Sequence, residues 1–476
     1  MVRRPLVLLL VLAAGGCAPH VRLAVEPNIV STEWREGAPS PTAEPVGAEH
    51  LADALGSAEL RRLTEHALAA NADLEAATAR IERARAELGT ARAAMLPVIS
   101  GSAGASHTRS DDKTDPYRFS EGFAQLDISY DLDLFGAARA GKRAARARAA
   151  AARFDRDATA LVVETEVARA WVQYCALTDR IRLLDRSIAD ERELERIIGV
   201  RYREGAATKV DTGLQAIETR NLETERVRLV EAQERTRDAL ALLAGEEAPL
   251  FNLADGSLAE IRVPALAPVQ PGELLVRRPD VRAAEARIKA ADGDVDAARR
   301  AFLPGLHLSA SGLGQAATLS GPVASTLAIG ASLLGPIFDR ARLNGRLHVA
   351  AADQHESVAL YRKTLLNALK ESEDALAGAA RSAERERLIA DVVANAETTT
   401  RLARMQYLEG DADLRTVLDA QRQLVQAEDA RALVVQERLN AAADLYEAMG
   451  GVPQGPAYAT PRNDSYQMRT RSSGLR

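Results

Sequence analysis

The chain has 476 residues, which is enough for two or three ordinary domains or for one elongated one. Its 61 Lys and Arg residues stand against 67 Asp and Glu, so the formal net charge is −6 at pH 7. This balance argues against nucleic acid as a partner, because no excess of positive charge is available to neutralise phosphates. Aromatic residues make up only 4% of the chain, and their scarcity favours closely packed helices with small side chains.

The first residues are typical of a bacterial secretory signal. Two arginines precede an apolar run from Leu6 to Ala14, which is too short for a stable membrane span. A pair of glycines then precedes Cys17, which resembles a lipobox, where the cysteine is acylated and becomes the new N-terminus. We expect a signal peptide over residues 1–16 and a covalent lipid on Cys17. The alternative is ordinary cleavage nearby with Cys17 incidental, because Ala14 stands where leucine is usual.

The chain contains the same unit twice. Three markers of the first half recur in the same order in the second half, at a nearly constant offset of 203 to 207 residues. These markers are Pro97 with Pro304, Phe135 with Phe338, and Gly205 with Gly410. Stacked solenoid repeats are much shorter than this offset, so the pattern predicts a tandem duplication of a domain-sized unit.

We expect the duplication to divide the chain, after the signal peptide, into five parts. They are an N-terminal and equatorial segment (17–70), a first repeat (71–245), an equatorial linker (246–276), a second repeat (277–451) and a C-terminal tail (452–476). Each repeat is expected to contain a helix, two strands, a very long helix and a returning helix. The predicted ranges are strands 96–108 and 119–132 with helices 136–198 and 211–243, then strands 305–314 and 323–334 with helices 339–402 and 413–449.

The longest predicted helices do not fit a compact domain. At about 1.5 Å per residue, a helix over 136–198 would extend for about 95 Å. Val167, Ala170 and Tyr174 begin a row of apolar residues at alternating spacings of three and four, which predicts a coiled-coil seam. Arg and Glu occupy most other positions, as on a solvated helix face. We therefore expect a mostly α-helical fold with long coiled-coil helices.

The predicted strands alternate between an apolar face and a small polar face. In the second strand, Ala124, Leu126 and Ile128 alternate with Gln125 and Asp127. No helix is evidently free to cover the apolar face, and no run of 18 apolar residues offers a transmembrane helix. A lipid-facing barrel wall around a hydrated lumen accounts for both faces. Because hydrocarbon requires a closed barrel and four strands are too few to close one, we expect the chain to oligomerise.

The second repeat passes from helix to strand at Pro304, which ends the preceding helix. Beyond this proline, the residues expected to face lipid are Leu306, Leu308 and Ala310, and those expected to face water are His307, Ser309 and Ser311. The corresponding Pro97 indicates that the chain makes this crossing twice.

Several blocks of the sequence resemble those of one protein family. They are the lipobox-like Cys17, "LLVRRPDVRAAEARI" with Arg277, Arg278, Pro279 and Asp280, "TVLDAQRQLVQAE" from Thr416, and "ADLYEAMGG" near the end. In this order, within a duplicated chain, they resemble an outer membrane factor of the TolC/OprM (NodT-type) family. The resemblance covers nearly the whole chain after residue 17.

This resemblance implies a homotrimer, in which four strands from each chain form a shared twelve-strand transmembrane β-barrel. The long helices would form a hollow α-barrel through the periplasm. The implied function is the passive outer-membrane exit duct of a tripartite, RND-type efflux pump. The implied partners are a periplasmic adaptor (membrane fusion) protein, an inner-membrane pump and outer-membrane lipid.

By the same resemblance, the periplasmic gate lies where the helical hairpins turn. Asp419 matches the family's constricting aspartate, and three copies would form a carboxylate ring that attracts cations. Thr416 stands where some members carry a second aspartate, and Arg415 replaces an apolar gating residue of close relatives. Arg415 would either pair with Asp419 and latch the gate or lie on an outer face. As an exposed helix pair, the two would contribute only about 0.3–0.5 kcal/mol.

Other charged residues near the hairpin turns have two interpretations. Arg422 could pair with Asp211 or Asp413 on a neighbouring hairpin. However, Asp211, Asp411 and Asp413 are also suitable N-cap and first-turn residues. We favour the gate for Asp419 and a capping role for Asp411 and Asp413.

No catalytic set is evident, and we do not expect an enzyme. His348 and His355 lie seven residues apart and are more typical of surface residues than of metal ligands. No glycine loop resembles a phosphate cradle. Cys175 lies in a helical stretch and is expected to be a buried structural thiol. We therefore expect no metal, and no cofactor apart from the lipid on Cys17.

Two other functions compete with efflux. The outer-membrane channel of a type I protein secretion system belongs to the same class of duct, but the Arg-Arg-Pro-Asp block and the lipobox favour the efflux branch. A structural periplasmic coiled-coil or adaptor protein would explain the long helices. It would not explain four alternating strands with uncovered apolar faces.

Overall fold

The structure is a computed structural model that describes residues 34–35, 44–45, 51–111, 114, 117–264, 266–267, 270–316 and 322–451. The expected signal peptide, the lipid site at Cys17 and the tail over 452–476 lie outside these residues. Contacts divide the chain into two compact units. The first includes Ala76–Arg156 and Asp280–Leu366, and the second includes Ser31–Glu75, Asp157–Pro279 and Asn367–Arg476. Each unit therefore combines segments of both repeats.

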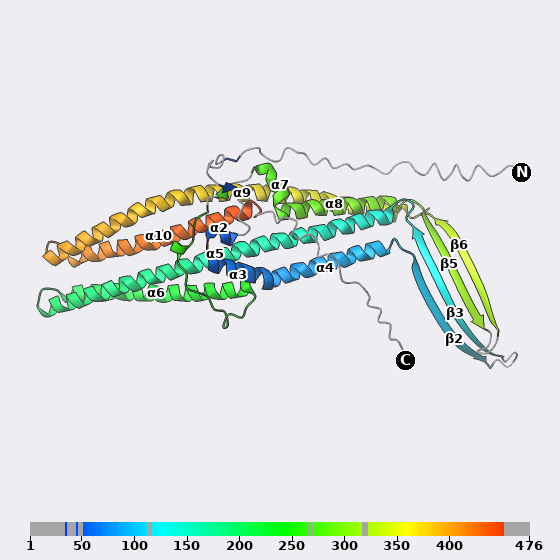
Figure 1. Ribbon diagram of the computed structural model, residues 1–476, viewed down its shortest axis with the longest axis horizontal. Coiled ribbons are helices and arrows are strands. Elements are labelled where there is room, and N and C mark those ends of the chain that lie inside the picture. The colour runs from blue at the N-terminus through cyan, green and yellow to red at the C-terminus, as the bar shows by residue number, and fades with distance from the viewer. Residues whose placement is uncertain are drawn as a thin grey trace, which may run out of the picture. The chain divides into compact units, whose positions relative to one another are not determined.

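The first unit contains a four-stranded antiparallel sheet (Figure 1). Its strands are β2 (Val98–Ser110), β3 (Tyr117–Leu132), β5 (Gly305–Ala316) and β6 (Val323–Leu334), in the order β2-β3-β5-β6. The central pair, β3 with β5, joins the two repeats, with Leu132 opposite Leu306. The outer edges of β2 and β6 have no strand partner among the described residues.

The strand register confirms the predicted division into two faces. Ile128 of β3 lies opposite Ala310 of β5, which lies opposite Ile329 of β6. On the other face, Asp131 of β3 lies opposite His307 of β5. No described residue of the chain covers the apolar face, and Ile329 is 79% exposed. Such a face requires another apolar environment.

The helices of the first unit pack through small residues. They are α4 (Ala72–Ala93), α8 (Pro279–Arg300) and the first parts of α5 (Ala137–Arg203) and α9 (Arg340–Glu409). Gly293 of α8 approaches Ala144 of α5 so closely that a Cβ on the glycine would come within 2.9 Å of the alanine backbone nitrogen. An ion pair of Arg287 with Asp155, at 2.7 Å, joins the same two helices. Close packing of this kind is what the low aromatic content predicts.

The second unit has an extensive hydrophobic core. Its elements are α2 (Leu51–Leu55), α3 (Ala58–Ala70), α6 (Lys209–Ala244), α7 (Leu274–Arg277), α10 (Leu414–Ala448), the remaining parts of α5 and α9, and a parallel pair of short strands, β1 (Glu44–Pro45) and β4 (Leu266–Ala267). Trp171 and Tyr174 of α5 stack in this core with their ring centroids 5.9 Å apart. Cys175 is buried beside them, as predicted, and burial raises the pKa of its thiol to about 12.

The two long helices extend further than the apolar spacing predicts. The predicted ends are residues 198 and 402, whereas α5 ends at Arg203 and α9 at Glu409. Both helices continue almost to a glycine in the left-handed region, Gly205 at φ +78° and Gly410 at φ +88°. These glycines, rather than the last apolar residue of the seam, set the helix ends. Among the described residues, no helix is both long and apolar enough to cross a membrane.

Candidate functional site at the hairpin ends

A buried apolar cluster joins the ends of the two helical hairpins, α5–α6 and α9–α10. Leu194 and Ile198 of α5 pack there with Tyr407 of α9 and Val417 of α10. The guanidinium of Arg201 lies 4.7 Å from the centre of the Tyr407 ring, close enough for a cation–π contact. The expected gate residues thus lie around a buried apolar cluster that holds the two hairpins together.

The second helix of the first hairpin, α6, begins with a complete capping box. Thr208 is the N-cap of α6, and its hydroxyl accepts a hydrogen bond from the N–H of Asp211. The Asp211 carboxylate in turn accepts from the N–H of Thr208 at 2.7 Å and from its hydroxyl at 2.8 Å. The Asp211 side chain therefore satisfies the start of a helix.

The second hairpin uses the same chemistry with the two residues exchanged. Asp413 is the N-cap of α10, and its carboxylate accepts from the N–H of Thr416 at 2.9 Å and from its hydroxyl at 2.7 Å. These hydrogen bonds lower the pKa of Asp413. The predicted capping role of Asp413 is confirmed, and Thr416 is its capping partner.

Asp411 does not cap α10, in contrast to our expectation. Its backbone N–H donates to the carbonyl oxygen of Gln406 at 2.8 Å. This bond closes the last turn of α9, because the left-handed Gly410 points the following N–H back towards the unpaired carbonyl groups of the helix end. The Asp411 backbone thus belongs to the end of one helix, and Asp413 begins the next.

Asp419 belongs to a network of ion pairs that joins α10 to α6. Arg422 donates to Asp419 Oδ1 at 3.1 Å and to Glu218 Oε2 of α6 at 2.9 Å. The Glu218 side chain is only 11% exposed, whereas Asp419 is 55% exposed. A buried carboxylate requires a cation partner, and Arg422 supplies it. Glu218 correspondingly raises the pKa of Arg422.

These contacts differ from the pairs considered from the sequence. Within the chain, Arg422 pairs with Glu218 and Asp419, because the carboxylates of Asp211 and Asp413 are already engaged in helix caps. Arg415 is exposed and forms no ion pair with Asp419 among the described residues.

A second buried carboxyl lies next to this ion-pair network. Glu191 of α5 is 3% exposed, and burial raises its pKa. The side-chain amide of Gln215 donates to both the carbonyl oxygen and the carboxylate of Glu191, and the negative charge of Glu218 raises the Glu191 pKa further. The α5–α6 contact therefore contains polar groups at its centre.

Sequence reasoning missed Glu191, Gln215 and Glu218. A signal was present, because Gln215 and Glu218 fall on the three-and-four spacing that leads to the buried Leu229. Polar residues in the register of an apolar seam are the positions where a buried network should be sought.

The Arg-Arg-Pro-Asp block lies away from the hairpin ends, at a junction between helices. Arg278 is buried and donates to the carbonyl oxygen of Ala448 at 3.1 Å and to Glu371 Oε2 at 2.7 Å. The carbonyl belongs to the C-terminal end of α10, where unpaired carbonyl groups and the helix dipole favour a cation. Gly450, at φ +83°, packs against the Arg278 backbone so closely that a Cβ on the glycine would lie 3.1 Å from the Arg278 nitrogen.

The other three residues of this block complete the junction. Arg277 approaches Glu273 at 3.5 Å, Pro279 is the first residue of α8, and Asp280 accepts from the N–H of Val281 at 2.9 Å. Within the second unit, Arg278 therefore gives the block a structural setting, in which it joins α7 to the end of α10.

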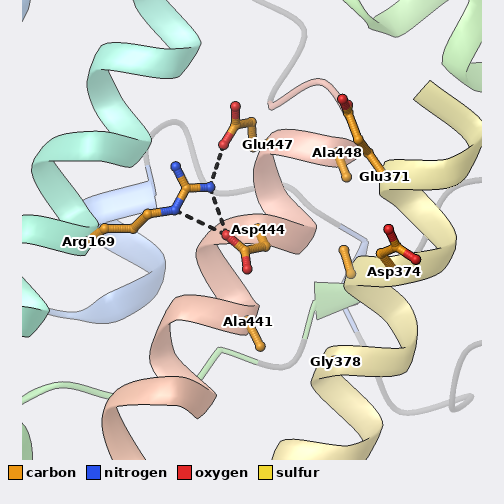
Figure 2. Close-up of a pocket in the computed structure, with 9 residues that line it drawn as sticks. Arg169, Glu371, Asp374, Gly378, Ala441, Asp444, Glu447 and Ala448 are labelled. Atoms are coloured by element: carbon orange, nitrogen blue, oxygen red, sulfur yellow. Dashed lines mark hydrogen bonds and ion pairs between the residues drawn. The ribbon is translucent and has the colours of Figure 1, made fainter. Parts of the chain in front are cut away.

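A cavity of about 320 Å³ lies between α5, α9 and α10 and is lined by several acids (Figure 2). Figure 2 shows Arg169 pointing towards Asp444 and Glu447, with hydrogen bonds of 2.7 and 2.6 Å. The remaining acids also form ion pairs: Glu371 pairs with Arg278, and Asp374 pairs with Lys370. No group of three or more potential metal ligands occurs in the part of the chain that is described.

Comparison with known proteins agrees with this architecture. A family model described as "Outer membrane efflux protein" matches residues 63–245 and 271–451. The pyoverdine export outer membrane protein OpmQ of Pseudomonas putida is 33% identical over 430 residues, which cover 87% of this chain and 90% of OpmQ. The outer membrane protein OprJ of Pseudomonas aeruginosa is 29% identical over 458 residues, covering 93% of this chain and 95% of OprJ.

Solved structures of outer-membrane proteins have the same fold. The outer-membrane channel OprN superimposes with a TM-score of 0.83 at 25% identity, covering 92% of this chain and 99% of OprN. The outer membrane protein VceC of Vibrio cholerae gives a TM-score of 0.76 at 27% identity, covering 83% of this chain and 97% of VceC. The duplicated architecture and these matches identify an outer-membrane efflux duct. The chain belongs to the outer membrane efflux protein family.

Proposed function

We propose that three copies of this chain form the passive exit duct of a tripartite, RND-type efflux pump, with a gate at the hairpin ends built around Asp419 and Arg422. The observation that carries the proposal is the four-stranded sheet, whose apolar face is uncovered and whose edge strands lack partners within the described chain. A lipid environment suits the apolar face, and neighbouring copies suit the edges, because a sheet in hydrocarbon must close into a barrel.

The duct itself supplies no energy in this proposal. A periplasmic adaptor protein and an inner-membrane pump deliver the cargo, and the chain acts neither as an enzyme nor through a cofactor. The names of several relatives, such as the solvent efflux pump outer membrane protein SrpC, support a role as the outer-membrane part of a pump. The relatives named for pyoverdine export and toluene efflux favour small molecules over secreted proteins as cargo.

The proposed gate rests on the ion-pair network at the hairpin ends. Arg422 holds α10 to α6 through Glu218, so hairpins that move apart must break or stretch this bond. Asp419 is exposed beside it, and three copies around a common axis would present three carboxylates to the cargo path. In this arrangement Arg422 limits the opening, and Asp419 favours cations at the opening.

Planar bilayer recordings of the purified chain test both parts. We expect wild-type trimers to conduct, and Asp419→Ala to raise the single-channel conductance and weaken the cation preference. Asp411→Ala is a matched control, because Asp411 is an exposed carboxylate of the same turn whose backbone, and not its side chain, forms a hydrogen bond among the described residues. A silent wild type would contradict the duct, whereas an Asp419→Ala channel with unchanged current and selectivity would contradict only the gate.

We also propose that Cys17 carries a lipid that anchors the mature N-terminus to the outer membrane. The support is the lipobox-like sequence that precedes it. Cys17→Ser should abolish palmitate labelling in cells, while Cys175→Ser, which removes the buried thiol, should leave the labelling intact. Labelling that persists in Cys17→Ser would refute the anchor.

A further inference from the structure

We propose that His307 and Asp131 form a proton-binding site in the lining of the barrel that sets how strongly the duct favours cations. The site lies on the polar face of the sheet, within the first unit, far along the chain from the gate residues. The inference rests on the proposed duct, because it is that proposal which assigns the polar face to the lumen.

The two side chains are held together across neighbouring strands. His307 of β5 and Asp131 of β3 are register partners, and His307 Nδ1 lies 2.8 Å from Asp131 Oδ1. The pair is open to solvent, with exposed fractions of 37% for the histidine side chain and 86% for the aspartate. On the far side of the histidine, the register partner is Ser332 of β6, which carries no charge.

The polar face carries almost only negative charge. The strand register places Glu121, Asp127 and Asp131 on this face, and no lysine or arginine shares it among the described strand residues. The arginines of the strands, Arg109 and Arg118, lie opposite each other on the other face. Among the described strand residues, the imidazole of His307 is therefore the one group on the polar face that can bind a proton and become positive.

The hydrogen bond determines where the proton is taken up. An ionised carboxylate can only accept hydrogen bonds, so Nδ1 of the histidine carries the hydrogen that it donates to Asp131. Nε2 is then the nitrogen that is available to bind a second proton. The resulting imidazolium lies against Asp131 and offsets one of the three carboxylates of the face.

Other charged groups near the pair already have hydrogen-bond or ion-pair partners. Asp127 lies on the same face of β3, four residues before Asp131, and its carboxylate accepts from Gln125 at 2.8 Å. Asp133 follows two residues after Asp131 and is paired with Arg139 at 3.1 Å. Both carboxylates thus have partners of their own, and the histidine is the group through which a bound proton changes the charge of this region.

The functional consequence is a change in charge selectivity. In water, a unit charge about 10 Å from the path of an ion changes the local concentration of monovalent ions about twofold. Neutralising Asp131 in each copy therefore reduces the preference of the barrel for cations, and anionic solutes meet less repulsion at acidic pH. At alkaline pH all three carboxylates act on the passing solute.

Reversal potentials of the full-length protein in planar bilayers, under a KCl gradient, test this inference. We expect the potassium-to-chloride permeability ratio of the wild type to fall by about fourfold or more between about pH 8 and pH 5, because a charge that doubles the local cations also halves the local anions. His307→Gln should keep the ratio seen at pH 8 and lose the response to acid. Asp131→Asn should lower the ratio already at pH 8.

The chain offers a matched control for the histidine. His107 of β2 also bonds a neighbouring strand, with Nδ1 2.8 Å from the Ser120 hydroxyl, but it lies on the opposite face of the sheet. His107→Gln should therefore retain the full response to acid. Trimers that survive unheated gel electrophoresis show that each variant has assembled.

The possible outcomes separate this inference from the duct itself. A conducting wild type whose permeability ratio does not change with pH overturns the inference without any variant. An undiminished pH response in assembled His307→Gln channels overturns it as well. A wild type that does not conduct at all refutes the duct, and with it the role of the pair.

Discussion

The two helical hairpins end in the same way and differ one turn later. Thr208 and Asp211 begin α6, and Asp413 and Thr416 begin α10, so that the hydroxyl and the carboxylate exchange places between the repeats. In both cases the pair satisfies the N–H groups of a helix start. The type of residue at these positions therefore reflects the need for a helix cap in both repeats.

The difference lies on the helix faces beyond the caps. Asp419 and Arg422 of α10 correspond, at the offset of 205 residues between Gly205 and Gly410, to Leu214 and Ile217 of α6. The second repeat has thus placed a charged pair where the first repeat has apolar side chains. Duplication supplied two equivalent hairpins, and at these two positions only the second carries charged side chains.

The largest effect is expected from removing the charge that distinguishes α10. Arg422→Gln leaves Glu218 without its cation in a site that is 11% exposed. An unsatisfied buried polar group costs about 1–3 kcal/mol, so the hairpin contact should loosen and the single-channel conductance should rise. Arg415→Gln is the control, because Arg415 has no ion pair with Asp419 among the described residues.

The Glu218 contact itself can be isolated with a second substitution. Glu218→Gln in the Arg422→Gln background removes the uncompensated buried charge, so the two changes should be less harmful together than their separate effects predict. Equal conductance and thermal stability for Arg422→Gln and Arg415→Gln would show that the contact does not hold the hairpins.

A smaller effect is expected from the caps. Thr208→Ala should destabilise the first hairpin by about 0.5–2 kcal/mol, because the N-cap hydrogen bond is lost. Exchanging the two residues, with Thr208→Asp and Asp211→Thr, should preserve most of the stability, because α10 already begins with this order. Thermal melting of the purified trimer measures both. A double variant as unstable as Thr208→Ala would show that the caps are not interchangeable.

The smallest effect is expected from pH at Glu191. Burial raises the pKa of this carboxyl above its ordinary value of 4.5. The folded state therefore binds the proton of Glu191 more tightly than the unfolded chain does. The stability that it contributes is present below the unfolded pKa and is lost as pH rises through the folded pKa. Glu191→Gln should therefore raise the melting temperature at neutral pH.

The gain should shrink as the pH is lowered, because the wild-type carboxyl then becomes neutral as well. Glu195→Gln, at an exposed position of the same helix, should change the melting temperature little at either pH. A gain that is independent of pH would mean that the charge of Glu191 is not the cause.

The architecture could be predicted because its signals are local. Alternation with a period of two separated Ile128 from Asp127, and the register of the sheet keeps them on opposite faces. The repeated prolines marked the ends of helices, and β2 and β5 begin directly after Pro97 and Pro304. The helix ends were predicted too early because the apolar seam ends before the glycine that turns the chain.

The partners at the candidate gate could not be predicted, because they depend on packing between distant segments. Arg422 and Glu218 are 204 residues apart, and several acids were chemically suitable as partners. The choice depends on which carboxylates the caps already use and on which one the helix contact buries. Both depend on geometry that no local pattern contains.

The strand order has a consequence for how a ring of chains is joined. Within one chain, β3 of the first repeat pairs with β5 of the second, which leaves β2 and β6 at the two edges. In the proposed trimer, β6 of one copy meets β2 of the next, so a second repeat again lies beside a first repeat. The ring is then six β-hairpins with pseudo-sixfold symmetry, connected covalently at every other junction. A circular permutant opened within residues 246–276, with its natural ends joined by a suitable linker, should therefore close the same barrel through the same strand pairs.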